Sequence, residues 1–149
     1  VSRMTKLDGT IMQSRSGRIR GDVTYTSACN SFFQGLTADG IKYAMWELCK
    51  KCYRMDAPFQ NVHPWVLIHD EIIAEGPEDT AHIWAPAMSE LMVKTMQEYI
   101  PDVPIEAEPA LMRRWHKDAA PVYDAEGTLL IWESPDERRK SGFAPANSH

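Results

Sequence analysis

The residues best suited to chemistry are His69, Asp70 and Glu71, a polar triplet between two apolar runs. The runs at 65–68 and 72–75 are typical of strands, so we expect a tight hairpin. Both strands should be buried in the sheet, and the triplet between them should project at the end of the sheet. Adjacent carboxylates repel each other unless a cation or a basic partner neutralises them. Magnesium takes one or two protein carboxylates together with substrate phosphates, so the turn suits phosphoryl transfer. An acidic surface hairpin explains the triplet as well.

A second polar group consists of Asn30 and Gln34, which is followed by Gly35. Residues four apart share a helical face, and both amides can donate hydrogen bonds. Acceptors occur in the DNA minor groove at every base pair, so such amides could check duplex shape without reading sequence. Gly35 would let a backbone come near. Taken alone, the pair is better explained as ordinary amides on a helix surface.

Charge is unevenly distributed along the chain. The net charge is −5, yet residues 1–60 hold nine Lys/Arg and five Asp/Glu, whereas residues 61–149 hold seven and sixteen. A basic first part with an acidic remainder suits a protein that touches phosphates on one face and holds cations on another. Solvated surface gives the same asymmetry.

The elements that must position these residues follow from apolar spacing. Three- and four-residue spacings predict a long helix from about residue 27 to 53, and a second helix from about 80 to 99. Further strands are expected at 105–112 and 128–132, and loop or short strands over 1–22. This order predicts an α+β fold with helices packed on an antiparallel sheet. We expect one domain over 1–133 and a mobile tail over 134–149.

Membrane and disulfide features are lacking in the sequence. No apolar run of about 18 residues occurs, and three cysteines do not suggest a disulfide framework, so a cytoplasmic setting is expected. Cys49 and Cys52 could be a zinc or redox pair, but without a second pair the packing of a helix explains them better.

Three blocks together resemble family A DNA polymerases, especially those of phages and bacteria. Residues 16–42 (SGRIRGDVTYTSACNSFFQGLTADGIK) resemble the helix before motif C, and residues 66–77 (VLIHDEIIAEGP) resemble motif C itself. Residues 108–117 (EPALMRRWHK) are similar to the closing strand and basic segment. The similarity covers roughly residues 16 to 132, and the order and spacing of all three blocks match.

The resemblance implies that this region is the C-terminal part of a polymerase palm. Asp70 would be the motif C carboxylate that helps to hold two catalytic Mg²⁺ ions, Glu71 a second and less critical one near the primer terminus, and His69 a neighbour of the primer strand. Gln34 and Asn30 would contact the minor-groove side of the template–primer duplex. Charge and position make Arg18 and Arg20 candidate phosphate contacts. Many cellular members have Arg where this sequence has Thr26.

Motif A, with the other main metal ligand, and motif B, which binds the incoming dNTP, are missing from these 149 residues. We therefore expect an enzyme that is active only with a second polypeptide carrying the fingers, the thumb and motif A. A cut or truncated longer chain is the alternative. Other readings are a single-subunit RNA polymerase, which Gln34, Gly35 and Glu71 disfavour, and an inactive remnant that binds DNA or assembles with a replisome.

Overall fold

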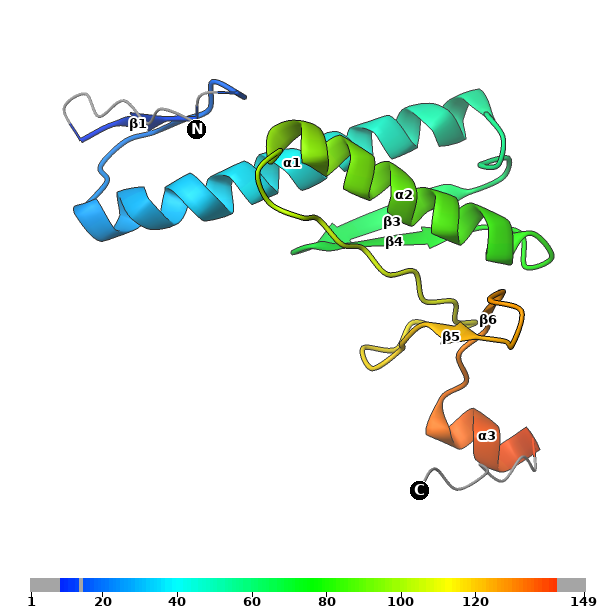
Figure 1. Ribbon diagram of the computed structural model, residues 1–149. Coiled ribbons are helices and arrows are strands. Elements are labelled where there is room, and N and C mark those ends of the chain that lie inside the picture. The colour runs from blue at the N-terminus through cyan, green and yellow to red at the C-terminus, as the bar shows by residue number, and fades with distance from the viewer. Residues whose placement is uncertain (1–8, 14, 142–149) are drawn as a thin grey trace.

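A computed structural model describes residues 9–13 and 15–141 of the chain, and Figure 1 shows their arrangement. Mixed helices and antiparallel strand pairs make up these residues, compatible with the predicted α+β class. The predicted long helix is confirmed as α1 (Tyr25–Arg54). Thr24 caps its start by accepting a hydrogen bond from the Ser27 amide at 3.3 Å. Met55 ends it in the left-handed conformation, with φ 55°.

The predicted hairpin is confirmed as β3 (His63–Ile68) and β4 (Glu71–Glu75), paired antiparallel with Leu67 opposite Ile72. The prediction that both strands are buried is wrong. Ile72 is buried, but Trp65, Val66 and Ile68 are 69%, 41% and 40% exposed. The physical reason is that this sheet has two strands, so one face packs on the helices and the other is uncovered among the described residues.

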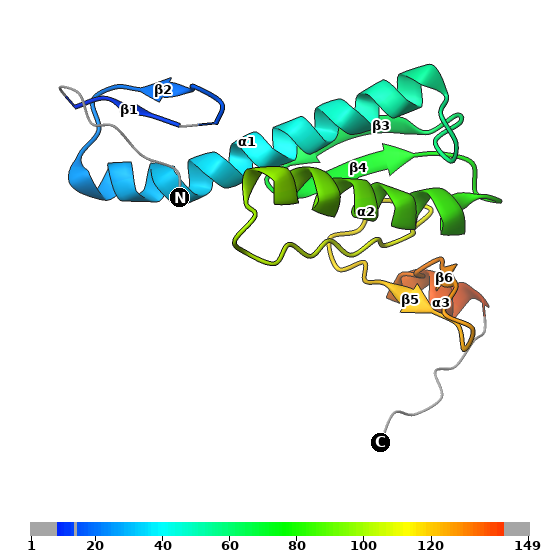
Figure 2. The same ribbon diagram turned by 45° about the horizontal axis from the view of Figure 1, so that its top comes forward.

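The second predicted helix is α2 (Ala81–Tyr99), and it lies beside α1 over the β3–β4 hairpin (Figures 1 and 2). Its Trp84 ring is buried and donates from Nε1 to the Pro77 carbonyl at 3.0 Å. The main core lies between α1, α2, the hairpin and the C-terminal segment, and its α1 members begin only at Ile41. The core residues are Ile41, Ala44, Leu48, Phe59, Val62, Ile72, Ala81, Trp84, Ala85, Met92, Met96, Leu111 and Leu129.

A small hairpin precedes α1, formed by β1 (Ile11–Met12) and β2 (Ile19–Arg20). It packs along the N-terminal half of α1, which extends beyond α2 and the β3–β4 hairpin (Figures 1 and 2). The described part of the region predicted as loop or short strands is therefore a strand pair. Residues 1–8 lie outside the described residues.

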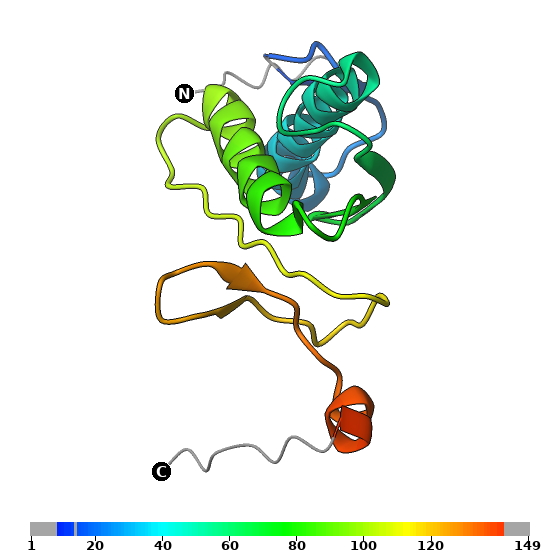
Figure 3. The same cartoon turned by 90° about the vertical axis from the view of Figure 1, so that its right-hand side faces the viewer.

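The C-terminal part forms a separate layer beneath α2 and the β3–β4 hairpin (Figure 3). It contains β5 (Val122–Tyr123), β6 (Leu129–Leu130) and α3 (Pro135–Ser141). The predicted strand at 105–112 is wrong, because this extended segment has no strand neighbour beyond a single bridge from Leu111 to Ile131. The predicted strand at 128–132 shortens to β6.

Helix α3 falls in the region predicted to be a mobile tail. It starts with a capping box, in which the Glu137 carboxylate accepts from the Ser134 amide at 2.9 Å and Ser134 Oγ accepts from the Glu137 amide at 3.3 Å. The rest of that predicted tail, 142–149, lies outside the described residues. None of the described helices is both long and apolar enough to span a membrane.

Candidate active site

The candidate catalytic turn joins β3 to β4 with only two residues, His69 and Asp70, while Glu71 already begins β4. His69 adopts the left-handed conformation, with φ 54°, because so short a turn requires positive φ. Asp70 and Glu71 are both exposed. The turn lies at the end of the hairpin directed toward the N-terminal half of α1 (Figures 1 and 2). The local sequence thus presents two carboxylates to solvent at one end of the β3–β4 hairpin.

These two carboxylates fit part of a magnesium site. Carboxylate oxygen is the donor type that Mg²⁺ prefers, and Mg²⁺ needs only one or two protein carboxylates when substrate phosphates complete its shell. No group of three or more His, Cys, Asp or Glu side chains is placed to hold a metal within the part of the chain that the structure describes. Asp70 and Glu71 can therefore supply the one or two carboxylate ligands that such a site requires.

The candidate duplex-contacting amides lie on α1. Asn30 and Gln34 occupy one face of its N-terminal half and both are exposed. Their amides make no hydrogen bond to other described residues, so their donors are available to a ligand. The structure thus places both amides in the half of α1 toward which the His69–Asp70 turn is directed (Figure 1).

The two candidate phosphate contacts are engaged within the protein. Arg18 Nε lies 3.2 Å from Asp39 Oδ1, and Arg18 Nη2 donates to the Gly35 carbonyl at 2.9 Å. Arg20 Nη1 donates to Ser31 Oγ at 2.6 Å. Both arginines therefore tie the β1–β2 hairpin to α1, although both remain exposed in part.

Gly35 explains why this hairpin can approach the helix. A Cβ at this position would collide with Gln13 Nε2 and would lie 2.9 Å from Arg18 Nη2. Gln13 in turn donates from Nε2 to the Ser31 carbonyl at 2.6 Å. A close approach thus occurs at Gly35, but side chains of the chain's own hairpin make it rather than the backbone that was predicted.

The protein-family model for DNA polymerase family A matches residues 4–117, well over half of the chain. The matched stretch includes α1, the β3–β4 hairpin and α2. The chain belongs to DNA polymerase family A. No curated protein and no solved structure matches it significantly.

Membership of DNA polymerase family A identifies the chain as a domain of a DNA-directed DNA polymerase, a nucleotidyltransferase of DNA replication. Such a domain binds DNA and dNTPs, and family A polymerases generally use Mg²⁺. The match contains all seven candidate site residues: Arg18, Arg20, Asn30, Gln34, His69, Asp70 and Glu71.

Sequence reasoning missed Gln13 and Asp39, which join the β1–β2 hairpin to α1 of this family A polymerase domain. Asp39 follows Gly35 by four residues, so a buried helical stripe of Ser31, Gly35 and Asp39 was the available signal. The partners of this stripe in the β1–β2 hairpin lie 11 to 23 residues away in the chain. Such contacts leave no periodic trace in the sequence.

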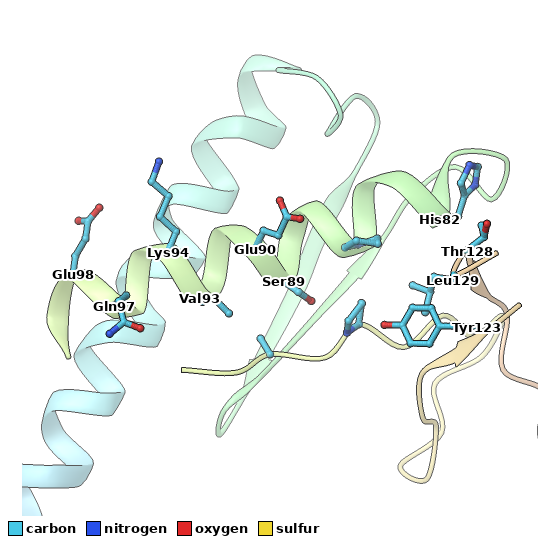
Figure 4. Close-up of a pocket in the computed structure, with 14 residues that line it drawn as sticks. His82, Ser89, Glu90, Val93, Lys94, Gln97, Glu98, Tyr123, Thr128 and Leu129 are labelled. Carbon is cyan, nitrogen blue, oxygen red and sulfur yellow. The ribbon is translucent and has the colours of Figure 1, made fainter. Parts of the chain in front are cut away.

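A groove of about 800 Å³ lies along α2 of the polymerase domain, between this helix and the C-terminal segment (Figure 4). Val93 and Ser89 point from α2 toward that segment, whereas Glu90 and Lys94 point away from it. No residue of α1 or of the His69–Asp70 turn lines the groove. The groove is therefore not part of the candidate active site.

Proposed function

We propose that this chain is the C-terminal palm segment of a family A DNA polymerase and contributes Asp70 to a two-metal site for nucleotidyl transfer. The observation that carries the proposal is the two-residue hairpin turn within the family match, which exposes Asp70 and Glu71 at one end of the β3–β4 hairpin. The N-terminal half of α1, with the exposed amides of Asn30 and Gln34, lies on that side (Figure 1).

Each residue then has a distinct role. The Asp70 carboxylate would help to hold the two catalytic Mg²⁺ ions, and Glu71 would be a second, less critical carboxylate nearer the primer terminus. Mg²⁺ bound there would activate the primer 3′-oxygen and neutralise charge on the triphosphate. His69 lies beside the last primer nucleotides. Asn30 and Gln34 donate to minor-groove acceptors and so test the shape of the newly formed base pair.

The site is only half of a polymerase centre. Because Asp70 and Glu71 are the only carboxylates at this turn, a second polypeptide, or another part of a longer chain, must bring motifs A and B. The uncovered face of the β3–β4 hairpin is a suitable docking surface, since Trp65, Val66 and Ile68 are exposed there. Burial of these side chains would join the divided palm through an apolar interface.

Reconstitution tests the proposal. The chain is mixed with a polypeptide that carries motifs A and B, and primer extension is followed with and without Mg²⁺. Extension should require both polypeptides and Mg²⁺, and Asp70→Ala should abolish it. Asp102→Ala, which removes another exposed carboxylate, is the matched control and should extend primers normally.

Full extension by the Asp70→Ala complex would remove Asp70 from the metal site. A wild-type complex that binds primer–template but adds no nucleotide would instead assign the chain to a DNA-binding remnant or an assembly subunit.

A further inference from the structure

The N-terminal half of α1 is held in place by the β1–β2 hairpin rather than by the main core. The first α1 residue in that core is Ile41, whereas the preceding buried residues of the helix are Ser31, Gly35, Asp39 and Gly40. This half projects beyond α2 and the β3–β4 hairpin (Figures 1 and 2). An isolated helix of this length is marginal in water, so its order depends on what packs against it.

The contacts that hold it are polar and specific. The Asp39 side chain is only 8% exposed, and it receives an ion pair from Arg18 at 3.2 Å and a hydrogen bond from Ser16 Oγ at 2.6 Å. Arg18 also donates to the Gly35 carbonyl at 2.9 Å. A buried carboxylate is costly unless paired in this way. Arg18 and Asp39 therefore form the centre of a clamp between the hairpin and the helix.

The clamp lies next to the amides proposed to touch DNA. Ser31, Gly35 and Asp39 form one helical stripe, and Asn30 and Gln34 form the stripe one residue before it. A rotation or loosening of this half of α1 would move both amides together. In addition, the charge of Arg18 is already compensated by Asp39, which makes Arg18 a poor source of charge for a phosphate.

We propose that Arg18 acts with Asp39 as a positioning residue that holds Asn30 and Gln34 toward the template–primer duplex, and not as a phosphate contact. This inference rests on the proposed function, since it assumes that the two amides meet DNA. It assigns Asp39 a role in the activity although its side chain is buried and cannot touch the duplex.

The test compares Asp39→Asn with Arg18→Ala in the full chain, using the affinity for a labelled primer–template over a series of salt concentrations. A positioning role predicts that each variant weakens binding about tenfold, as the loss of a buried charged hydrogen bond would. The salt dependence should keep its slope, and the double variant should be no weaker than either single one. Arg139→Ala, an exposed arginine on α3, is the charge-matched control.

A phosphate contact predicts the opposite pattern. Asp39→Asn would then leave affinity unchanged or raise it, because it releases Arg18, and only Arg18→Ala would weaken binding, with a salt slope smaller by about one. Arg18→Lys separates the roles again, because lysine keeps the charge but cannot reproduce the forked contact with Asp39 and Gly35. Retained affinity in Arg18→Lys would overturn the inference.

Amide hydrogen exchange of residues 25–36 gives a readout that does not need DNA. Exchange should accelerate in Asp39→Asn and in Gly35→Ala, whose added methyl group displaces Gln13 and Arg18. Unchanged exchange in both variants would overturn the clamp. If the wild-type chain with its completing polypeptide fails to bind primer–template, the proposed function fails, and exchange then decides the clamp by itself.

Discussion

The indole ring of Trp84 packs so closely on the backbone of Gly76 that a Cβ there would lie 2.9 Å from Trp84 Cε2. Gly76 follows β4 directly, and Trp84 belongs to the first turn of α2. Trp84 also donates from Nε1 to the Pro77 carbonyl at 3.0 Å. The contact therefore fixes the base of the β3–β4 hairpin to the start of α2. This is the hairpin whose turn exposes Asp70.

Gly76→Ala should destabilise the fold by about 1 to 3 kcal/mol, because a buried ring cannot move aside without cost. Urea denaturation of the isolated chain would measure the change in the free energy of unfolding. Gly21→Ala is the control, since a Cβ at Gly21 meets no atom within 4 Å. Equal stability of the two variants would show that the Trp84 contact is loose.

His69→Gly should stabilise the chain by about 0.5 to 1 kcal/mol while it impairs primer extension by the reconstituted polymerase. Histidine is strained in the left-handed conformation, at φ 54°, and glycine removes that strain. Glycine also raises the conformational entropy of the unfolded chain, which offsets part of the gain. Thermal denaturation and a primer-extension assay would measure the two effects. Asn61→Gly is the control at φ 58°, where asparagine already tolerates this conformation, so its gain should be smaller.

The ion pair between Glu78 and Arg113 makes a pH-dependent contribution to stability. Arg113 Nη2 lies 2.7 Å from Glu78 Oε1, and this hydrogen bond lowers the pKa of the carboxyl below its ordinary value of 4.5. A pKa lower in the folded state means stability that is present above pH 4.5 and is lost as the pH falls through the folded value. Glu78→Gln should therefore lower Tm at neutral pH, and the difference should shrink as the pH falls below 4.5. A constant difference across the series would contradict the pairing.

Thiol labelling should distinguish Cys29 from Cys52 by their rates of reaction. Burial raises the pKa of the Cys52 thiol to about 11, so it holds little thiolate at pH 8, whereas Cys29 is exposed. Iodoacetamide should modify Cys29 first and Cys52 slowly, as mass spectrometry of the peptides would show. Fast labelling of Cys52 would contradict its packing in α1.

The parts that sequence reasoning predicted are those with local causes. Apolar spacing predicted α1, α2 and the hairpin, and the exposure of Asn30, Gln34 and Asp70 follows from helix and hairpin geometry. The burial of β3 and the strand at 105–112 were wrongly predicted, because strand pairing depends on neighbours that the local sequence does not specify. The roles of the exposed residues remain predictions.

The contacts of Arg18 were unpredictable for a related reason. Basic residues shortly before a helix indicate a surface that binds nucleic acid. Nothing in these residues specifies that Asp39, 21 residues after Arg18, lies beside Arg18. A spacing of four residues places Asp39 on one helical stripe with Gly35, but only the three-dimensional arrangement shows that the hairpin covers that stripe.

The uncovered β3–β4 hairpin has a consequence for the life of this chain in a cell. A two-stranded sheet with an apolar face and open edges is a template for other strands, including those of a second copy. On the proposed division of the polymerase into two polypeptides, chains synthesised in excess of the second polypeptide would self-associate and precipitate. Synthesis of the two polypeptides in equal amounts, or their assembly soon after translation, would protect the hairpin from self-association. The exposed hairpin therefore constrains how the chain is expressed rather than how it catalyses.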